Sequence, residues 1–348
     1  MQKYCLARLP FLFRFILVTL IHLCLLTAAD AQQRYEFESR LMGTTFKIIL
    51  FAEDDSVAQS AAGRAFDHIE YLNRVLSDYL PDSELSRLSK NAGSGNEIQI
   101  SKPLYELLEK SIDISKATDG WFDLTIGPYS HIWRGLNRMT NPSLPDSAEL
   151  ADAESRVGYE LISLQTDGQK TELIKKEMRL DPGGIGKGFA AQSALDFLNE
   201  KGISRALIDA GGDVTTGAPP PGEIGWTIAI PVQVTKDSSF YREIVIANRS
   251  VNTSGSLYQS VEIDGIHYSH IINPKTGLGH TEQVQVSVLS KNGADADAWA
   301  TALNVMPSAK AKELIESRPD LEAVIFRLNE KGATERWASS GFDDFLKP

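Results

Sequence analysis

The sequence predicts an α+β protein with mostly antiparallel sheets and flanking helices. Short apolar runs typical of strands recur between helical patterns along most of the chain, so both element types are spread throughout. Some of these runs alternate apolar and polar residues, as antiparallel strands with one covered face do. The stretch 283–288 is an example, because valine occupies every second position from Val284 to Val288.

A strand followed by a helix is predicted near the start of the domain. Apolar residues at every second position predict a strand over Thr45–Phe51, and Asp55 or Ser56 can cap the helix that follows. This helix should bury an apolar face whose members recur at helical spacing: Val57, Ala61, Ala65, Ile69, Leu72 and Leu76.

The remaining predicted elements continue this mixture. A helix should open at Pro103 and run towards Gly120, and the mostly polar stretch 135–158 is expected to be an excursion. Strands are then predicted at Glu160–Leu164, Ala206–Asp209, Trp226–Pro231, Glu243–Ala247 and Val284–Leu289. Further helices are predicted at Phe189–Asn199, Ala294–Met306 and Ser308–Ser317.

Residues 1–31 are predicted to be a secretory signal peptide that is cleaved before Gln32. Basic residues precede or flank an apolar run from Phe15 to Leu26, and small residues follow it. The alternative is a membrane anchor, but the run is short for a bilayer and His22 interrupts it. A lipid anchor would need a cysteine just after small residues, and Cys24 lies too early. We therefore expect an exported, periplasmic domain over residues 32–348.

Composition excludes several functions for the mature chain. Removing residues 1–31 takes away three positive charges and one negative charge, so the formal net charge falls from −11 to −13, which argues against nucleic acid as a partner. Cys5 and Cys24 both lie in the removed segment, which excludes disulfides, thiolate nucleophiles and cysteine-ligated metals. The remaining residues suffice for one large domain or two intimately packed lobes.

The stretch Asp181–Phe189 contains four glycines between a strand-like run and a predicted helix. Backbone amides at a helix N-terminus attract phosphate, and glycines let the main chain approach an anion closely. Lys187 adds a positive charge there. The spacing matches neither a Walker A loop nor the dinucleotide fingerprint. The alternative interpretation is a tight glycine turn without a ligand.

An acidic helical pattern over Ala294–Leu303 places Asp297 and Thr301 one turn apart on the same face. Mg²⁺ prefers such oxygen ligands and is commonly completed by substrate phosphates. In the alternative interpretation, Asp295 and Asp297 merely favour the helix N-terminus electrostatically, and Thr301 bonds back to a carbonyl.

Residues 265–277 should form a strand that runs into a Pro/Gly turn. His267 and His270 face opposite sides of such a strand, so they are not expected to share a zinc ion. His270 could orient a phosphate or transfer a proton, whereas His267 is expected to be structural. The aromatic residues of Ser77-Asp78-Tyr79 and Gly120-Trp121-Phe122-Asp123 could stack on a flat heterocycle or belong to the core.

Eight ordered segments resemble the motifs of the ApbE family of FAD:protein FMN transferases, over about residues 40–306. They are Met42-Gly43-Thr44, Ser77-Asp78-Tyr79 with Ser83-Glu84-Leu85, Gly120-Trp121-Phe122-Asp123, Asp181–Phe189, Gly211-Gly212-Asp213, Thr253-Ser254-Gly255, His270–Gly277 and Ala296–Leu303. The resemblance implies a single ApbE-like domain over residues 32–348, built of two intimately packed lobes. It favours a phosphate-binding glycine stretch, and a Mg²⁺ site at Asp297 and Thr301, over the alternatives given for these two stretches. The chain departs from the usual sequence of the family at Asn273, which is assigned no role, and at Ala191-Gln192.

The resemblance also implies which residues act. FAD is expected to contact Met42, Tyr79, Trp121, Phe122, Asp123, Asp181, Lys187, His270 and Ile271, with residues 121–123 contributing both backbone and side chains. Mg²⁺ is expected to be held by Asp297, Thr301 and a main-chain oxygen of Gly184. His270, Lys187 and Asp181 are the candidate catalytic residues.

The implied reaction is Mg²⁺-dependent transfer of FMN from FAD to a Ser or Thr hydroxyl of an acceptor protein, with release of AMP. The acceptor should carry a Ser/Thr-Gly-Ala-Ser/Thr motif and be a flavin-carrying subunit of a membrane redox complex. One alternative is an FAD pyrophosphatase that yields FMN and AMP, which Tyr79 disfavours if its ring covers the flavin. The others are a non-catalytic periplasmic flavin-binding protein, which needs no phosphate-bound metal, and an exported domain of unknown role.

Overall fold

The computed structural model describes residues 32–167, 169–235, 238–256, 260–328 and 333–347. The predicted signal peptide lies outside this part of the chain, so its cleavage and the boundary at Gln32 stay predictions. Within the described residues, no helix is both long enough and apolar enough to cross a bilayer.

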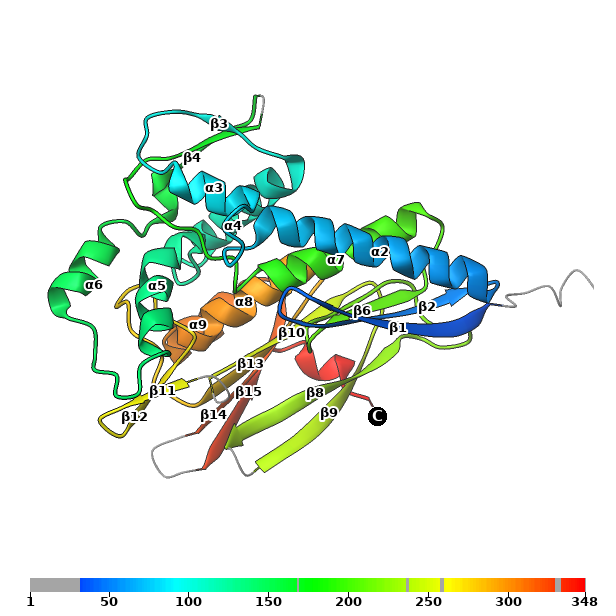
Figure 1. The fold of residues 1–348 in the computed structure, drawn as a ribbon. Helices are drawn as coiled ribbons and strands as arrows, with labels where there is room; N and C mark the ends of the chain where they lie inside the picture. Colours follow the sequence, from blue (N-terminus) through cyan, green and yellow to red (C-terminus); the bar gives the residue numbers. More distant parts are fainter. Residues whose placement is uncertain (1–31, 168, 236–237, 257–259, 329–332, 348) are drawn as a thin grey trace, which may run out of the picture.

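An antiparallel sheet of eight strands forms the centre of the molecule (Figure 1). Its order is β1-β2-β6-β7-β10-β13-β14-β15, and every neighbouring pair runs antiparallel. In this order the strands span Gln33–Leu41, Thr44–Ala52, Ala206–Ala210, Val214–Thr216, Ser250–Gly255, Val284–Ser290, Glu322–Leu328 and Thr334–Ala338. The predicted mixed fold with mostly antiparallel sheets is confirmed.

The edge strand β1 pairs with β2 through a two-residue turn made of Met42 and Gly43. Leu41 pairs with Thr44 across the turn, and the φ angles of Met42 and Gly43 are 49° and 76°. Positive φ at both turn residues gives the turn a twist that matches the flanking strands. β1 was missing from the predicted elements, although the alternation of charged residues with Tyr35 and Phe37 is typical of a strand with one covered face.

Three helices cover one face of the sheet: α2 (Asp55–Leu76), α7 (Gly186–Glu200) and α8 (Gly293–Val305). Asp54, one residue before the predicted caps, caps α2 by accepting a 2.9 Å hydrogen bond from Val57 N. The buried face is shifted accordingly in the first turns, where Ala58 and Ala62 are buried while Val57 is 43% exposed. Further along α2 the predicted face is correct.

The β8–β9 hairpin (Trp226–Thr235 and Ser238–Ile246) packs on the other face of the sheet. Its apolar residues join Val324 and Phe326 of β14 in a second hydrophobic core. The prediction that one face of β13 is open was therefore wrong. All of β13 is buried, and Gln285 donates a hydrogen bond to the Pro231 carbonyl of β8.

A smaller lobe, at the upper left of Figure 1, precedes α7 in the chain. It contains the helices α3 (Glu84–Lys90), α4 (Lys102–Ala117), α5 (Gly127–Leu136) and α6 (Ser147–Glu154). It also contains a three-stranded sheet of order β3-β5-β4 (Ile98–Gln99, Lys170–Leu173 and Ile162–Gln165). The excursion predicted for residues 135–158 contains α6.

The two lobes share one hydrophobic core. A continuous cluster of buried residues includes Leu85 of α3, Leu104 of α4, Ile48 of β2 and Trp299 of α8. A third cluster joins α5 to the hairpin of β11 (Ser260–Ile263) and β12 (Ile266–Ser269). The chain ends with α9 (Ser308–Glu316), the last two strands of the sheet and the 3₁₀ turn η3 (Phe342–Phe345). This shared core agrees with two intimately packed lobes.

Candidate active site

The glycine-rich stretch forms the turn that leads into α7. The Pro182 carbonyl accepts hydrogen bonds from Ile185 N at 3.0 Å and from Gly186 N at 2.7 Å, which reverses the chain just before the helix begins. The preceding segment, residues 174–182, is irregular, so the strand-like run expected before Asp181 was wrong. Asp181 N is held instead by the Leu124 carbonyl at 2.8 Å.

The N-terminus of α7 meets the side of α8 at Asp297. The amide of Gly188 donates a 2.9 Å hydrogen bond to Asp297 Oδ2, and the nearby amide of Lys187 also favours the charged form of this carboxylate. Glycines allow this approach, because a methyl group at position 188 would lie 2.1 Å from the Gly293 carbonyl oxygen. These amides face a carboxylate of the protein itself. Fewer amides of the glycine turn are therefore left to bind phosphate than the sequence predicts.

Gly184 lies directly against Thr301. A methyl group at position 184 would lie 2.9 Å from both Oγ1 and Cγ2 of Thr301. Thr301 and Asp297 are one turn apart on α8, so both point to the side of the helix that meets the glycine turn. The structure therefore brings together the three residues that the sequence predicts to hold a cation.

Lys187 lies between two buried carboxylates. It forms an ion pair with Asp213, which follows the turn after β6 and is 5% exposed. Partial burial opposes the charged form, yet the pKa of Lys187 is raised because Asp297 and Asp213 stabilise its charge. Burial raises the pKa of Asp297 to about 6, with Lys187 opposing the shift and Asp213 adding to it. Asp213 belongs to the motif Gly211-Gly212-Asp213, for which the sequence predicts no role.

The donor set around Gly184 fits Mg²⁺. It offers one carboxylate, one hydroxyl and a main-chain carbonyl, which are the hard oxygen ligands that this ion prefers. No cluster of three or more His, Cys, Asp or Glu side chains suited to a metal occurs in the described residues. A site with a single carboxylate suits an ion that keeps waters and is completed by substrate phosphates. The buried Asp297 carboxylate, whose pKa is raised, would also gain from a neighbouring cation.

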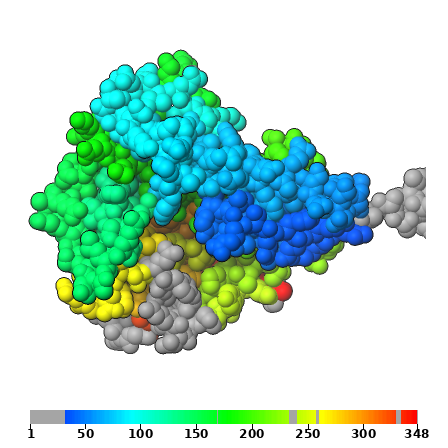
Figure 2. Space-filling view, viewed as in Figure 1, coloured from blue at the N-terminus to red at the C-terminus, as the bar shows by residue number. Residues whose placement is uncertain are grey.

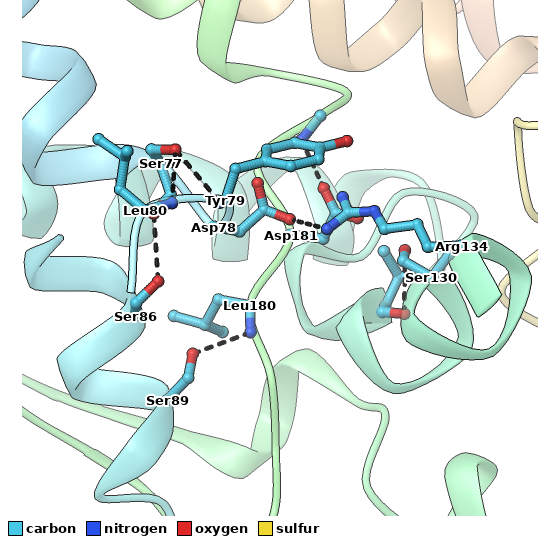
Figure 3. Close-up of polar contacts among 12 residues, drawn as sticks. Ser77, Asp78, Tyr79, Leu80, Ser86, Ser89, Ser130, Arg134, Leu180 and Asp181 are labelled. Atoms are coloured by element: carbon cyan, nitrogen blue, oxygen red, sulfur yellow. Dashed lines mark hydrogen bonds and ion pairs between the residues drawn. The ribbon is translucent and has the colours of Figure 1, made fainter. Parts of the chain in front are cut away.

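Asp181 belongs to a second cluster, centred on Arg134 of α5 (Figure 3). The guanidinium forms ion pairs with Asp78 Oδ2 at 2.5 Å and with Asp181 Oδ2 at 2.9 Å. Its Cζ lies 4.3 Å from the centroid of the Tyr79 ring. Burial, and then the charge of Asp181, raise the pKa of Asp78 to about 6. Sequence reasoning missed Arg134, because nothing in its local pattern indicates that three segments converge on it.

Tyr79 and Arg134 also line a cleft of about 490 Å³, together with residues of α3 and of the segment 176–180. This volume lies in the range of small-molecule sites. A second cavity of about 490 Å³ between α4, α7 and α8 is lined by several carboxylates, such as Glu106, Asp113 and Asp295. It is lined by none of the predicted site residues, whereas the cleft beside α3 is lined by one of them, Tyr79.

Other predicted FAD contacts lie around the same loops. The Met42 side chain reaches to about 3.9 Å from the position of a methyl group on Gly186. Trp121 is half-buried, with Lys310 Nζ 6.0 Å from its ring centroid. Lys275 Nζ lies against Gly120, where a methyl group would be 2.9 Å away, so the turn after β12 meets the loop that carries Trp121. Figure 2 shows a hollow where the cyan, green and yellow parts of the chain meet.

The side chains of Phe122 and Asp123, which are predicted to contact the flavin, are almost fully enclosed by protein. Phe122 is 4% exposed and Asp123 is 6% exposed. The Asp123 carboxylate accepts hydrogen bonds from Thr125 N at 2.8 Å, Thr125 Oγ1 at 2.7 Å and Tyr159 N at 2.9 Å. It thus ties together the 3₁₀ turns η1 (Leu124–Ile126) and η2 (Tyr159–Leu161). Its side chain has a structural role in this conformation.

The predicted residues after β12 have different environments. His270 is exposed, and Ile271 is 7% exposed with its amide bonded to Ser269 Oγ at 3.1 Å. His267 Nε2 lies 3.8 Å from Glu262 Oε2 on the paired strand. Asn273 Oδ1 accepts a 2.9 Å hydrogen bond from Lys275 N, which shapes the turn.

Comparison with known proteins points to one family. The model of the ApbE family matches residues 42–325. The chain is similar to a FAD:protein FMN transferase of Klebsiella pneumoniae, with 27% identity over 324 residues that cover 92% of this chain and 91% of that protein. The Escherichia coli K12 protein of the same name is 28% identical over 314 residues, covering 89% and 88%. The flavin transferase ApbE from Vibrio cholerae has a TM-score of 0.80 and 26% identity, covering 90% of this chain and 100% of that structure.

Proposed function

Because the chain belongs to the ApbE family, we propose that it is a Mg²⁺-dependent FAD:protein FMN transferase. FMN would pass from FAD to a Ser or Thr hydroxyl of an acceptor protein. The observation that carries the proposal is the meeting of the glycine turn with α8, where Gly184 lies against Thr301 and Gly188 N donates to Asp297 beside Lys187. The names of the similar enzymes support the same reaction.

The residues of this cluster have complementary tasks. Asp297, Thr301 and the Gly184 carbonyl would hold Mg²⁺, and the bound ion supplies positive charge that stabilises developing charge on phosphate oxygens. The amides at the start of α7 hold the Asp297 carboxylate in place. Lys187, kept protonated by Asp213 and Asp297, supplies a permanent cation next to the phosphates. Positioning and electrostatics of this kind provide most of the catalysis in phosphoryl-type transfers.

The reaction exchanges one phosphorus–oxygen bond for another. The acceptor hydroxyl oxygen attacks the FMN phosphorus, and the bond from this phosphorus to the bridging oxygen breaks, so AMP leaves with that oxygen. The hydroxyl proton passes to a base, for which the exposed imidazole of His270 is our candidate. Asp181 is tied to Arg134 and to Gly183 N at 2.8 Å, which suits it better to shaping the loop than to proton transfer.

The acceptor and the location of the reaction are part of the same proposal. We expect the target Ser or Thr in a Ser/Thr-Gly-Ala-Ser/Thr motif of a flavin-carrying subunit of a membrane redox complex. An exported enzyme, cleaved before Gln32, would meet such a subunit in the periplasm.

Intact-mass measurement tests the proposal. The protein lacking residues 1–31 is incubated with FAD, Mg²⁺ and a peptide that carries the acceptor motif. The peptide should gain the mass of an FMN group, and AMP should appear in equal amount. No mass gain in the peptide or in the candidate acceptor subunits would overturn the transferase.

The same assay separates the alternatives. A pyrophosphatase would release FMN and AMP at the same rate with and without the acceptor peptide. A flavin-binding protein would retain intact FAD in the presence of Mg²⁺ and peptide. A transferase should release AMP mainly when the acceptor is present.

A further inference from the structure

Tyr79 presents an aromatic ring to solvent on a firmly held backbone. The residue is 75% exposed. Ser77 Oγ accepts hydrogen bonds from the amides of Tyr79 at 3.2 Å and Leu80 at 3.3 Å, and Ser86 Oγ donates to the Ser77 carbonyl at 3.3 Å. An aromatic side chain exposed to this extent, on a rigid turn that lines a cleft, is suited to stack on a flat heterocycle.

Arg134 determines how this ring is held. Its guanidinium, centred 4.3 Å from the ring centroid, supports one side of Tyr79. The plane of the guanidinium is fixed in turn, because one terminal nitrogen pairs with Asp78 and the other pairs with Asp181. Lysine could not reproduce this arrangement, since its ammonium group is a single point charge without a planar fork.

The cluster joins three separate segments of the chain. Asp78 and Tyr79 follow α2, Arg134 lies on α5, and Asp181 opens the glycine turn. Asp181 Oδ1 also accepts the 2.8 Å hydrogen bond from Gly183 N, next to the residue that lies against Thr301. Arg134 therefore connects the aromatic wall to the turn that approaches the phosphate and metal residues.

We propose that Arg134 is a positioning residue for the flavin: it holds the ring of Tyr79 as one wall of the isoalloxazine site and links this wall, through Asp181, to the glycine turn. The inference rests on the proposed function, because it assumes that FAD is the substrate. It adds a residue for which the sequence predicted no role, and it assigns Asp181 to positioning.

The test compares Arg134→Lys and Arg134→Ala with a matched control, Arg138→Ala. Arg138 is exposed just beyond α5, so its removal takes away one positive charge from the same region. FAD binding is measured by quenching of flavin fluorescence on titration with protein, with Mg²⁺ and no acceptor. Steady-state transfer then gives KM for FAD, KM for the acceptor peptide and kcat.

Both Arg134 variants should bind FAD about tenfold more weakly and lose most of the quenching, as Tyr79→Leu should. The KM for FAD should rise while the KM for the peptide changes little. Arg138→Ala should behave like the wild type. Combining Tyr79→Leu with Arg134→Lys should be no worse than Tyr79→Leu alone, because Arg134 acts through the ring.

Other outcomes overturn the inference. If both Arg134 variants keep the quenching and the FAD affinity of Arg138→Ala, Arg134 does not position the flavin. Independent, additive losses from Tyr79→Leu and Arg134→Lys would show that Arg134 does not act through Tyr79. Thermal unfolding identifies a variant that fails to fold, and Arg134→Lys, which retains the charge between the two carboxylates, then carries the test. A wild-type protein that quenches flavin fluorescence but transfers no FMN contradicts the transferase and not the role of Arg134.

Discussion

The amide of Gly188 donates a 2.9 Å hydrogen bond to the carboxylate of Asp297, although the two residues are 109 positions apart in the sequence. Two helices thus meet at the point where each carries a predicted site residue. Glycine at position 188 permits this contact, because any side chain there would overlap the backbone of Gly293. The site depends on this close packing, which leads to the first prediction.

Gly188→Ala should separate α7 from α8. The new methyl group would lie 2.1 Å from the Gly293 carbonyl oxygen and 2.7 Å from Asp297 Cβ, so the backbone must shift. Overpacking of this kind costs about 1–3 kcal/mol in the free energy of unfolding. Gly63→Ala is the control, because a methyl group on this α2 residue meets nothing within 4 Å and should stabilise the helix by about 0.5–1 kcal/mol. Urea unfolding of both variants measures this, and equal stability would contradict the close contact.

Asp297→Asn should remove the charge that holds the cation while retaining an oxygen for Gly188 N. The transfer rate should fall by about a hundredfold, and the half-maximal Mg²⁺ concentration should rise. Asp295→Asn lies on the same helix but pairs with Lys110 at 2.9 Å and should leave both quantities unchanged. Initial rates over a range of Mg²⁺ concentrations check this. A normal Mg²⁺ dependence in Asp297→Asn would exclude Asp297 as a ligand.

Thr301→Val should weaken Mg²⁺ binding, whereas Thr301→Ser should not. Valine keeps the shape of the side chain beside Gly184 but lacks the hydroxyl oxygen, whereas serine keeps the oxygen. The half-maximal Mg²⁺ concentration should rise about tenfold or more for valine only. Similar behaviour of the two variants would mean that Thr301 acts through packing alone.

The free energy of unfolding should depend on pH through Asp78, which belongs to the Arg134 cluster. The pKa of its carboxyl is raised from 3.8 to about 6 in the folded protein. Between these values the folded state binds more protons than the unfolded state, so this group's contribution to stability is present at low pH and is lost as the pH rises towards 6. Asp78→Asn lacks this dependence. The free energy of unfolding of the wild type minus that of Asp78→Asn should therefore fall between pH 4 and pH 6, by up to about 1.4 kcal/mol per pH unit. A difference that rises over this range would show that Arg134 lowers the pKa of Asp78 below its ordinary value.

Asp123→Ala should affect folding more than FAD affinity. Its carboxylate accepts three hydrogen bonds from Thr125 and Tyr159, and their loss leaves buried donors without partners. This should lower the free energy of unfolding by about 2 kcal/mol or more. Asp113→Ala, at an exposed position of α4, should cost little. Urea unfolding gives the stabilities, and flavin fluorescence gives the affinity of the folded fraction. A stable Asp123→Ala variant that binds FAD poorly would restore the predicted flavin contact of this side chain.

Much of the fold could be predicted from local patterns. The helices α2, beyond its first turns, and α4 follow from apolar residues that repeat at helical spacing, whereas α8 is buried on nearly all sides. The environment of β13 could not be predicted, because its burial depends on a remote segment. The polar side of β13 is buried where the β8–β9 hairpin covers it, and no pattern within β13 indicates that hairpin.

The sequence by itself determined the fold class, the family resemblance and the chemical types of the site residues, because these depend on residue identity and spacing along one element. Only the tertiary structure decided that the α7 amides hold Asp297, that the Asp123 carboxylate is enclosed, and that Arg134 joins Tyr79 to Asp181. Such contacts join segments that lie far apart in the chain, and their geometry is determined by how the helices pack, which no local pattern encodes.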